Sequence, residues 1–477
     1  MPQSPTTLTD ELGIALSNLA DAAVAPFTPT LRLGVTGLSR AGKTIFITSL
    51  IHNLTTGGRL PGFAAMTEGR FIGARVTEHP EQGVPRFAYE QHLRALMGNP
   101  ATWPESTRKI SQIRLQLKFQ SQRWTRGWQG PTLLNLDIVD YPGEWLLDLP
   151  LLSLSYAEWS AQAIGRAELT HSGSEADAFL NVLRTMDEHA EANEPDADKL
   201  AASFTAYLRR SREDGALSTL PPGRFLMPGD LEGSPALTFA PLPAPKGPAR
   251  SSSLHAMMER RYEAYKSLVV RPFFRDHFAR LDRQIVLVDT LRALNAGPAA
   301  VADLETALTD ILGCFRQGDN NVLTRLVARR IDRILFAATK ADHIHSSSHD
   351  RLEALMNRLV AQAARRAKFA GAQTKSIALA AIRATRESVV EEHEVIVGTP
   401  QAGETLDGVS YDGKTEVALF PGDLPADPDK LLSAPVALNF LRFQPPGKLE
   451  KNAEGNVVLP HIRFDRAIDF LLGDWLK

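Results

Sequence analysis

The most constraining feature of this sequence is a glycine-rich loop that separates a strand pattern from a helix pattern. The loop reads GLSRAGKT over residues 37–44 and fits the motif G-x-x-x-x-G-K-[ST]. Apolar residues alternate with small or polar ones over 31–36, as in a strand, and recur at helical spacing over 45–54. A strand, this loop and a helix in that order are typical of phosphate-binding α/β folds, so they limit the fold class before other residues are considered.

The loop predicts a phosphate site in which backbone N–H groups point inward and the positive end of the helix dipole faces the anion. Lys43 is expected to reach the β and γ phosphates and to act in catalysis. The Thr44 hydroxyl is expected to ligate Mg²⁺, which prefers oxygen ligands. The residues expected around the phosphates are Ser39, Arg40, Ala41, Gly42, Lys43, Thr44 and Ile45. The alternatives are a chance match to the motif and a degenerate loop that holds no phosphate.

A second motif follows the apolar strand pattern at 133–139, where the chain continues as Asp140-Tyr-Pro-Gly143-Glu144. An acidic residue at the carboxyl end of a strand beside a phosphate loop is the usual water-mediated ligand of Mg²⁺, which assigns that role to Asp140. Gly143 has no side chain in the way and can turn its backbone N–H toward a γ phosphate. D-x-x-G alone also fits an ordinary turn at the end of a strand, so the prediction depends on the upstream loop.

A base-reading motif, Thr339-Lys340-Ala341-Asp342, follows the apolar strand pattern at 333–338 and matches [NT]-K-x-D. One carboxylate can accept from both the N1–H and the amino group of guanine, whereas adenine offers an acceptor at N1 and would be repelled. Asp342 therefore predicts guanine, and Lys340 is expected along the base plane. Backbone N–H groups of Ala381 and Ile382, after the next strand, are assigned to the guanine O6 by position alone. The alternative is a surface loop that happens to hold Lys and Asp.

A hydroxyl residue that covers Mg²⁺ when a γ phosphate is present is expected before the antiparallel strand at 113–119. Thr107 is the candidate, as a metal ligand and a catalytic residue, in a segment opened by Trp103-Pro104 that would cross the mouth of the site. Ser106 and Ser111 are rivals, and a helix cap or turn residue is the alternative to a switch.

Composition limits the partners and the compartment. The chain has 477 residues, 43% of them hydrophobic, and a net charge of −2, which gives no electrostatic reason to expect nucleic acid or an anionic membrane as the main partner. The single cysteine, Cys314, argues for a reducing compartment. No apolar run predicts a transmembrane segment, and the polar start is unlike a signal peptide. We expect a cytoplasmic protein, with peripheral attachment to the inner membrane through a partner left open.

The motifs stand in the order typical of the translation-factor and Ras-like class of P-loop GTPases. More narrowly, GLSRAGKT, VDYPGEWLLDLPLL, PGRFLMPGD, RQIVLVDTLRALNAG and TKADHI resemble the YcjX family of bacterial P-loop NTPases over most of the chain. The resemblance implies a cytoplasmic, stress-associated nucleotide-binding protein, either ATPase or GTPase. Ras-like enzymes orient water with glutamine after D-x-x-G, whereas this chain has Glu144, which cannot donate to a γ phosphate, so slow hydrolysis is expected. Arg40 is expected to supply transition-state charge, or to face solvent.

The fold expected is α/β, a doubly wound and mainly parallel sheet of the Ras-like P-loop class with helical and β-rich insertions. Parallel strands are expected to begin near 31, 132, 284, 332 and 375, with the strand near 113 antiparallel at the edge. The predicted parts are an N-terminal helix at 1–30, nucleotide-domain segments at 31–56, 106–145 and 284–385, insertions at 57–105, 146–283 and 386–460, and a closing helix at 461–477.

These features predict a Mg²⁺-dependent GTPase that acts as a slow switch on GTP and GDP and reports its state to an unidentified protein effector. Two alternatives remain. One is an ATPase or small-molecule kinase on the same loop, which Asp342 disfavours. The other is a scaffold that holds nucleotide without turning it over.

Overall fold

The computed structural model describes residues 28–477 except 39, 80, 106–108, 123–130, 170–173, 188–189, 215–219, 246, 248–249, 278–279, 314–330, 370 and 434–437. Its chain divides into two compact units. Among the described residues, a helical unit holds 143–280 and 303–313, and a sheet unit holds 28–142, 281–302 and 331–477. The predicted N-terminal helix, Ser39, Ser106, Thr107 and Cys314 lie outside the described residues. Their assignments and the finer partition of the chain stay predictions.

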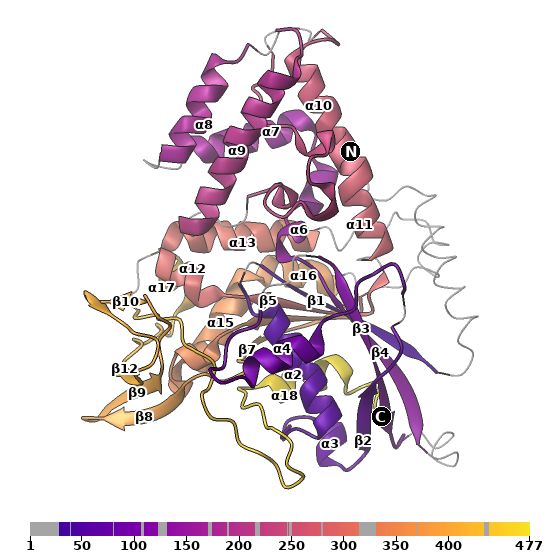
Figure 1. The fold of residues 1–477 in the computed structure, drawn as a ribbon, viewed down its shortest axis with the longest axis vertical. Helices are drawn as coiled ribbons and strands as arrows, with labels where there is room; N and C mark the ends of the chain where they lie inside the picture. The colour runs from indigo at the N-terminus through magenta and orange to yellow at the C-terminus, as the bar shows by residue number, and fades with distance from the viewer. Residues whose placement is uncertain are drawn as a thin grey trace. The chain divides into compact units, whose positions relative to one another are not determined.

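The sheet unit is built on seven strands in the order β2-β3-β4-β1-β5-β6-β7 (Figure 1). Their bounds are β1 Thr30–Gly37, β2 Phe71–Val76, β3 Ser111–Phe119, β4 Thr132–Asp140, β5 Arg283–Val288, β6 Arg333–Ala338 and β7 Gln373–Ala378. From β4 through β1 to β7 every pairing is parallel, and β3 pairs antiparallel with β4. This confirms the predicted doubly wound, mainly parallel sheet and the antiparallel strand next to β4.

The place of β3 differs from the prediction, which put it at the edge of the sheet. β2 pairs antiparallel with its outer side, from Phe71 opposite Phe119 to Val76 opposite Leu115. The residues FIGARV predict a strand, but they are only half-buried and Gly73 interrupts the register. A short amphipathic strand carries no signal for its partner, so only the tertiary structure assigns β2 to this sheet.

Helices α2 and α18 and the strands of the sheet share one hydrophobic core. The Phe46 and Phe464 rings pack edge to face at 5.1 Å between centroids, which ties the phosphate-loop helix to α18. Successive residues of a strand face opposite sides, so Ile334 and Phe336 face away from this core, and α15 packs on β6 and β7. The helices of this unit are α2 Lys43–Thr56, α3 Ala64–Thr67, α4 Tyr89–Leu96, α12 Thr290–Ala296, α15 His349–Leu359, α16 Ala361–Phe369, α17 Pro428–Ser433 and α18 Phe464–Leu472.

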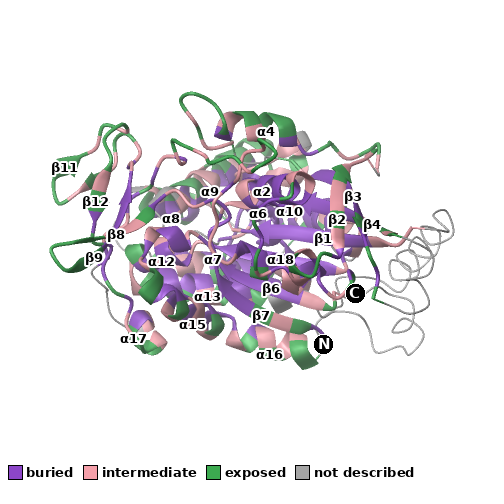
Figure 2. Ribbon diagram, turned by 90° about the horizontal axis from the view of Figure 1, so that it is seen from below, coloured by how far each residue is buried: buried purple, intermediate pink, exposed green. Residues whose placement is uncertain are grey.

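The β-rich segment predicted after residue 386 forms a small sheet in the order β12-β9-β8 and a separate hairpin, β10-β11. The strands are β8 Arg386–Val390, β9 His393–Gly398, β10 Thr405–Leu406, β11 Val409–Ser410 and β12 Val417–Leu419. Figure 2 shows exposed residues along β8 and β11, while the strands of the large sheet are mostly buried. A separate small core of Ile396, Leu419, Leu441 and Phe443 holds the segment together.

The helical unit confirms the helices predicted after residue 146. Its elements up to residue 237 are α6 Gly143–Leu146, η1 Leu149–Ser153, α7 Tyr156–Leu169, α8 Ser174–Thr185, α9 Glu194–Asp214, η2 Gly223–Phe225, η3 Gly229–Leu231 and η4 Pro235–Leu237. They are followed by α10 Leu254–Tyr265, the π-helical η5 Lys266–Val270 and α11 Arg271–Asp276. Helix α13 Pro298–Gly313 begins in the sheet unit and ends in this unit. Where the structure describes the proline-rich stretch, it packs on the helical unit as expected, because Phe239 is fully buried among aromatic rings. Pro272 opens α11 directly after the π-helical turn. Of the helices that the structure describes, none combines the length and apolar character needed to cross a membrane.

Candidate nucleotide-binding site

The loop between β1 and α2 depends on its two motif glycines for different reasons. Gly42 caps α2 in the left-handed region, with φ of 85°, a conformation that costs glycine little. Gly37 lies against β5, and a Cβ there would stand 2.7 Å from the Leu287 carbonyl oxygen. Arg40 also has a positive φ of 62°. The local backbone therefore requires glycine once for its dihedral angles and once for close packing of two strands.

Lys43 and Thr44 begin α2 at the mouth of this loop. The Lys43 ammonium donates to the Gly37 carbonyl oxygen at 3.0 Å and so lies across the loop. Thr44 is 7% exposed, and its carbonyl accepts from the Thr48 hydroxyl at 2.7 Å. The first turn of α2 carries no acidic residue, and its cap residue Gly42 makes no side-chain hydrogen bond, so the first turn itself does not neutralise the positive helix end. This end of α2 is suited to an anion.

Two of the residues expected to hold Mg²⁺ are described, Thr44 at the start of α2 and Asp140 at the end of β4. Asp140 ends β4, pairs in register with Val35 of β1, and is 1% exposed. Ser111, a rival for the switch hydroxyl, stands opposite Asp140 at the start of β3. Within the described part of the chain, no cluster of three or more His, Cys, Asp or Glu side chains could hold a metal ion. One hydroxyl and one carboxylate fit Mg²⁺, which usually keeps waters and takes its other ligands from phosphates.

The TKAD motif leaves β6 in a conformation fixed by long-range contacts. Lys340 has a φ of 60°, and its ammonium forms an ion pair with Asp289, 51 residues earlier. Asp342 is 4% exposed, and its Oδ2 accepts from the Ala384 N–H at 2.8 Å. The Thr385 hydroxyl donates to the Asp342 carbonyl oxygen. The loop after β7 therefore holds the Asp342 carboxylate in one orientation.

The two predicted motifs line one cavity of about 300 Å³ in the sheet unit, within the usual range of ligand pockets. It is lined by Arg40, Ala41, Gly42, Lys43, Thr44 and Ile45 of the phosphate loop, by Thr339, Lys340, Asp342 and His343, and by Leu379, Ala380, Ala381 and Ile382. Segments separated by about three hundred residues thus meet at the carboxyl ends of parallel strands, where such sheets bind ligands. Their binding roles stay predictions.

The loop after β7 places Ala381 and Ile382 on the cavity wall. The preceding N–H, of Ala380, already donates to the Ile462 carbonyl oxygen at 3.1 Å. The Ala381 carbonyl points elsewhere, because it accepts from the Ser49 hydroxyl of α2 at 3.0 Å. The assignment of the Ala381 and Ile382 N–H groups to a guanine oxygen stays a prediction.

Seven further residues line the cavity: Phe46, Trp103, Pro104, Leu287, Gln401, Arg442 and Phe443. The sequence predicts that the Trp103-Pro104 pair crosses the mouth of the site. Gln401, Arg442 and Phe443 belong to the β-rich segment, and sequence reasoning missed them because no motif or periodicity marks them.

Positive charge gathers beside this cavity. Burial first, and then the charges of Arg40 and Arg442, lower the pKa of Arg292, while Asp289 raises it. Asp289 caps α12, because its carboxylate accepts from the Arg292 N–H at 3.2 Å. The cavity is lined by Arg40, Lys43, Lys340 and Arg442 against the single carboxylate of Asp342. Lys340 and Arg442 form ion pairs with Asp289 and Glu404, and the remaining balance of charge favours an anionic ligand.

Gly143 and Glu144 belong to the helical unit. Glu144 is 7% exposed, and its carboxylate lies 3.8 Å from the Arg212 guanidinium. Its backbone is packed so tightly that a Cβ on Gly223 would stand 1.8 Å from the Glu144 carbonyl oxygen. The structure shows a buried ion pair for Glu144, and the catalytic roles of Gly143 and Glu144 stay predictions.

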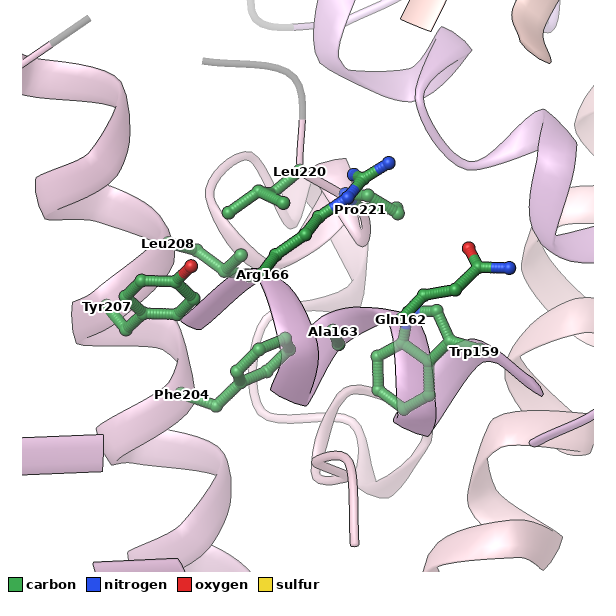
Figure 3. A pocket seen from close by; sticks show the side chains of 9 residues that line it. All are labelled: Trp159, Gln162, Ala163, Arg166, Phe204, Tyr207, Leu208, Leu220 and Pro221. Carbon is green, nitrogen blue, oxygen red and sulfur yellow. The ribbon is translucent and has the colours of Figure 1, made fainter. Parts of the chain in front are cut away.

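A second pocket lies within the helical unit, between α7 and α9 (Figure 3). Its lining residues are Trp159, Gln162, Ala163, Arg166, Phe204, Tyr207, Leu208, Leu220 and Pro221. Its volume of about 10 Å³ has room for a single water at most, so it does not suit a nucleotide.

Comparisons with known proteins agree on one family. The model of the YcjX-like family, DUF463, matches residues 31–476. A curated relative from Escherichia coli (strain K12), named Ras-like GTPase YcjX, is 37% identical over 459 residues, which cover 94% of this chain and 96% of the relative. A relative of the same name from Shewanella oneidensis is 36% identical over 468 residues, covering 94% of this chain and 95% of the relative.

Proposed function

Because this chain belongs to the YcjX-like family, whose curated relatives are named Ras-like GTPases, we propose that it binds GTP and GDP and hydrolyses GTP slowly with Mg²⁺. The observation that carries the proposal is the single cavity lined by both the phosphate loop and the TKAD motif. A phosphate loop and a base-reading carboxylate that line one cavity match the phosphate and base parts of a nucleotide.

Guanine is proposed over adenine because of Asp342. Its Oδ2 accepts from the Ala384 N–H, so the other carboxylate oxygen and the remaining lone pairs are left to accept from guanine N1–H and the 2-amino group. The Lys340 ammonium is held by Asp289, which keeps the stem of Lys340 at the cavity wall. An ATPase or kinase on the same loop would leave this buried acid facing the adenine N1 acceptor.

In this proposal the Thr44 hydroxyl and the Asp140 carboxylate hold Mg²⁺, Asp140 through water, with Thr107 added in the GTP state. The metal would supply charge neutralisation between the β and γ phosphates. Lys43 binds the same phosphates, and Arg40, which lines the cavity, adds positive charge. Gly143 offers its backbone N–H to the γ phosphate.

Slow turnover follows from Glu144. This residue replaces the water-orienting glutamine, and its carboxylate already faces Arg212 within the helical unit. A glutamate used in an ion pair is a weak acceptor for the attacking water, so the barrier is lowered mainly by the phosphate-side charges. A scaffold that binds nucleotide and does not hydrolyse it is the second candidate, and the same ion pair favours it.

The proposed cellular role is a nucleotide-controlled switch in the cytoplasm, linked to stress, that acts on a protein effector. The supporting observation is that the chain runs from Asp140 directly into α6, whose four residues are buried in the helical unit. A change of backbone at 140–143 would therefore have to be taken up by that unit. Membrane association through a partner remains part of the proposal.

The test uses the purified full-length chain. A fluorescent GDP analogue is titrated with and without Mg²⁺, and the bound analogue is competed with GTP, GDP, ATP and ADP. Single-turnover hydrolysis of labelled GTP follows. Binding displaced by GTP and GDP but not by ATP, with slow Mg²⁺-dependent phosphate release, is expected. Displacement by ATP as efficient as by GTP would refute guanine selectivity, and binding without phosphate release would favour the scaffold.

A further inference from the structure

The Phe443 carbonyl oxygen is a junction between two chain segments at the rim of the nucleotide cavity. It accepts from the Trp103 indole N–H at 2.7 Å and from the Gln401 side-chain amide at 3.1 Å. All three residues line the cavity. Trp103 precedes β3, whereas Gln401 and Phe443 belong to the β-rich segment, so these bonds join parts of the chain about three hundred residues apart.

The same junction contacts the base-reading loop. The Phe443 ring meets the His343 ring edge to face, at 5.2 Å between centroids and 87° between planes. His343 directly follows Asp342, and burial lowers the pKa of His343, so its ring is held as a neutral aromatic neighbour. Phe443 is 2% exposed. The position of Phe443 is therefore coupled to the loop that would read guanine.

The other end of the junction reaches the phosphate-loop helix. Trp103 packs against a small cluster of Leu96, Ile382 and Leu459, and Ile45, at the start of α2, packs against the same cluster. Both isoleucines also line the cavity. Trp103 stands four residues before Thr107, the predicted switch hydroxyl. The contacts run from the base-reading loop through Phe443 and Trp103 to the segment that leads into that switch.

We propose that Trp103 and Gln401 are positioning residues that hold Phe443 as the rim of the base end of the cavity, and that they slow the release of guanine nucleotide. The inference rests on the proposed function. A nucleotide that leaves past this rim requires the rim to open, and opening breaks the bonds to the Phe443 carbonyl oxygen. The effect should lie in the dissociation rate, because contacts of the closed state change koff more than kon.

The experiment measures release of a fluorescent GDP analogue from the full-length chain by stopped flow, with binding sites counted by titration. Trp103→Phe keeps the ring but removes its N–H, and Gln401→Leu removes the second donor. Trp475→Phe is the matched control, because Trp475 belongs to the same unit, is 36% exposed and does not line the cavity.

Each single variant should release GDP about threefold to tenfold faster, since the loss of one of two donors costs about one net hydrogen bond. The double variant should exceed the product of the two single effects, because only then does the carbonyl lose both donors. The association rate, the number of sites and Trp475→Phe should match the wild type.

Unchanged koff in the double variant, with binding intact, overturns the inference and leaves GTP binding standing. Fewer sites with an unchanged koff mean that the two side chains serve folding alone, which also overturns it. A wild-type protein that binds no guanine nucleotide at all refutes the proposed function, and the inference with it.

Discussion

Asp342→Asn is the sharpest perturbation of the base-reading loop, because the structure fixes the way in which the new amide would lie. Oδ2 of Asp342 accepts from the Ala384 N–H at 2.8 Å, and this N–H can only donate. An asparagine would keep its carbonyl oxygen on Ala384 and turn its NH₂ group toward the base. The loop should stay folded while the hydrogen bonds demanded of the base reverse.

The size of the change follows from the bonds exchanged. Wild-type Asp342 would accept two charge-assisted hydrogen bonds from guanine, each contributing about 1.5–3 kcal/mol. Their loss predicts GDP binding weaker by about 10²- to 10⁴-fold. Xanthine has an oxygen in place of the 2-amino group and can accept from the new NH₂, so binding of its diphosphate should strengthen.

The assay measures how well GDP and xanthosine diphosphate displace a bound fluorescent GDP or xanthosine analogue, in the wild type and in the variant. Asp429→Asn is the matched control, because its side chain is 70% exposed and does not line the cavity. The base assignment is wrong if Asp342→Asn binds GDP as tightly as the wild type, or if it loses GDP without gaining xanthosine diphosphate.

Three further predictions follow from named groups. Lys43→Ala should lose most nucleotide affinity, whereas Thr44→Ala should mainly lose the Mg²⁺ dependence of binding, and equal Mg²⁺ dependence in titrations of wild type and Thr44→Ala would contradict this division. Thr107→Ala should leave GDP affinity unchanged, slow hydrolysis and abolish GTP-dependent protection of residues 100–112 in hydrogen exchange; the same protection with GDP and a GTP analogue in wild type would rule the switch out. Burial raises the pKa of Asp148 from 3.8 to about 6 in the folded protein, although the hydrogen bonds that its carboxylate accepts from the Tyr265 hydroxyl and the Gly223 N–H act to lower it. The folded state thus holds this proton more tightly than the unfolded chain, and the stabilisation, present below pH 3.8, is lost as the pH rises through about 6. The free energy of unfolding should lose about 3 kcal/mol from this group over that range, a dependence that Asp148→Asn removes, and equal pH slopes for both proteins in denaturant titrations would contradict it.

The fold class and the two motifs that line the cavity could be predicted from local sequence patterns. The reason is that the chemistry of these motifs is contained in consecutive residues. A phosphate loop needs its glycines, Lys43 and Thr44 at fixed spacing, and a base-reading loop needs Asp342 directly after a buried strand. The strands of the large sheet were also predicted, because buried parallel strands read as apolar runs.

Long-range packing brings the distant segments together around the cavity, and local sequence patterns do not predict it. The ion pair of Lys340 with Asp289 and the bond from Ala384 to Asp342 join residues that no local pattern relates. The same holds for Phe443, which reaches the cavity from the β-rich segment, and for β2, which lies at the edge of the sheet in place of β3. Such pairings depend on how whole elements pack, and packing contacts between remote segments leave no periodicity or spacing in the sequence.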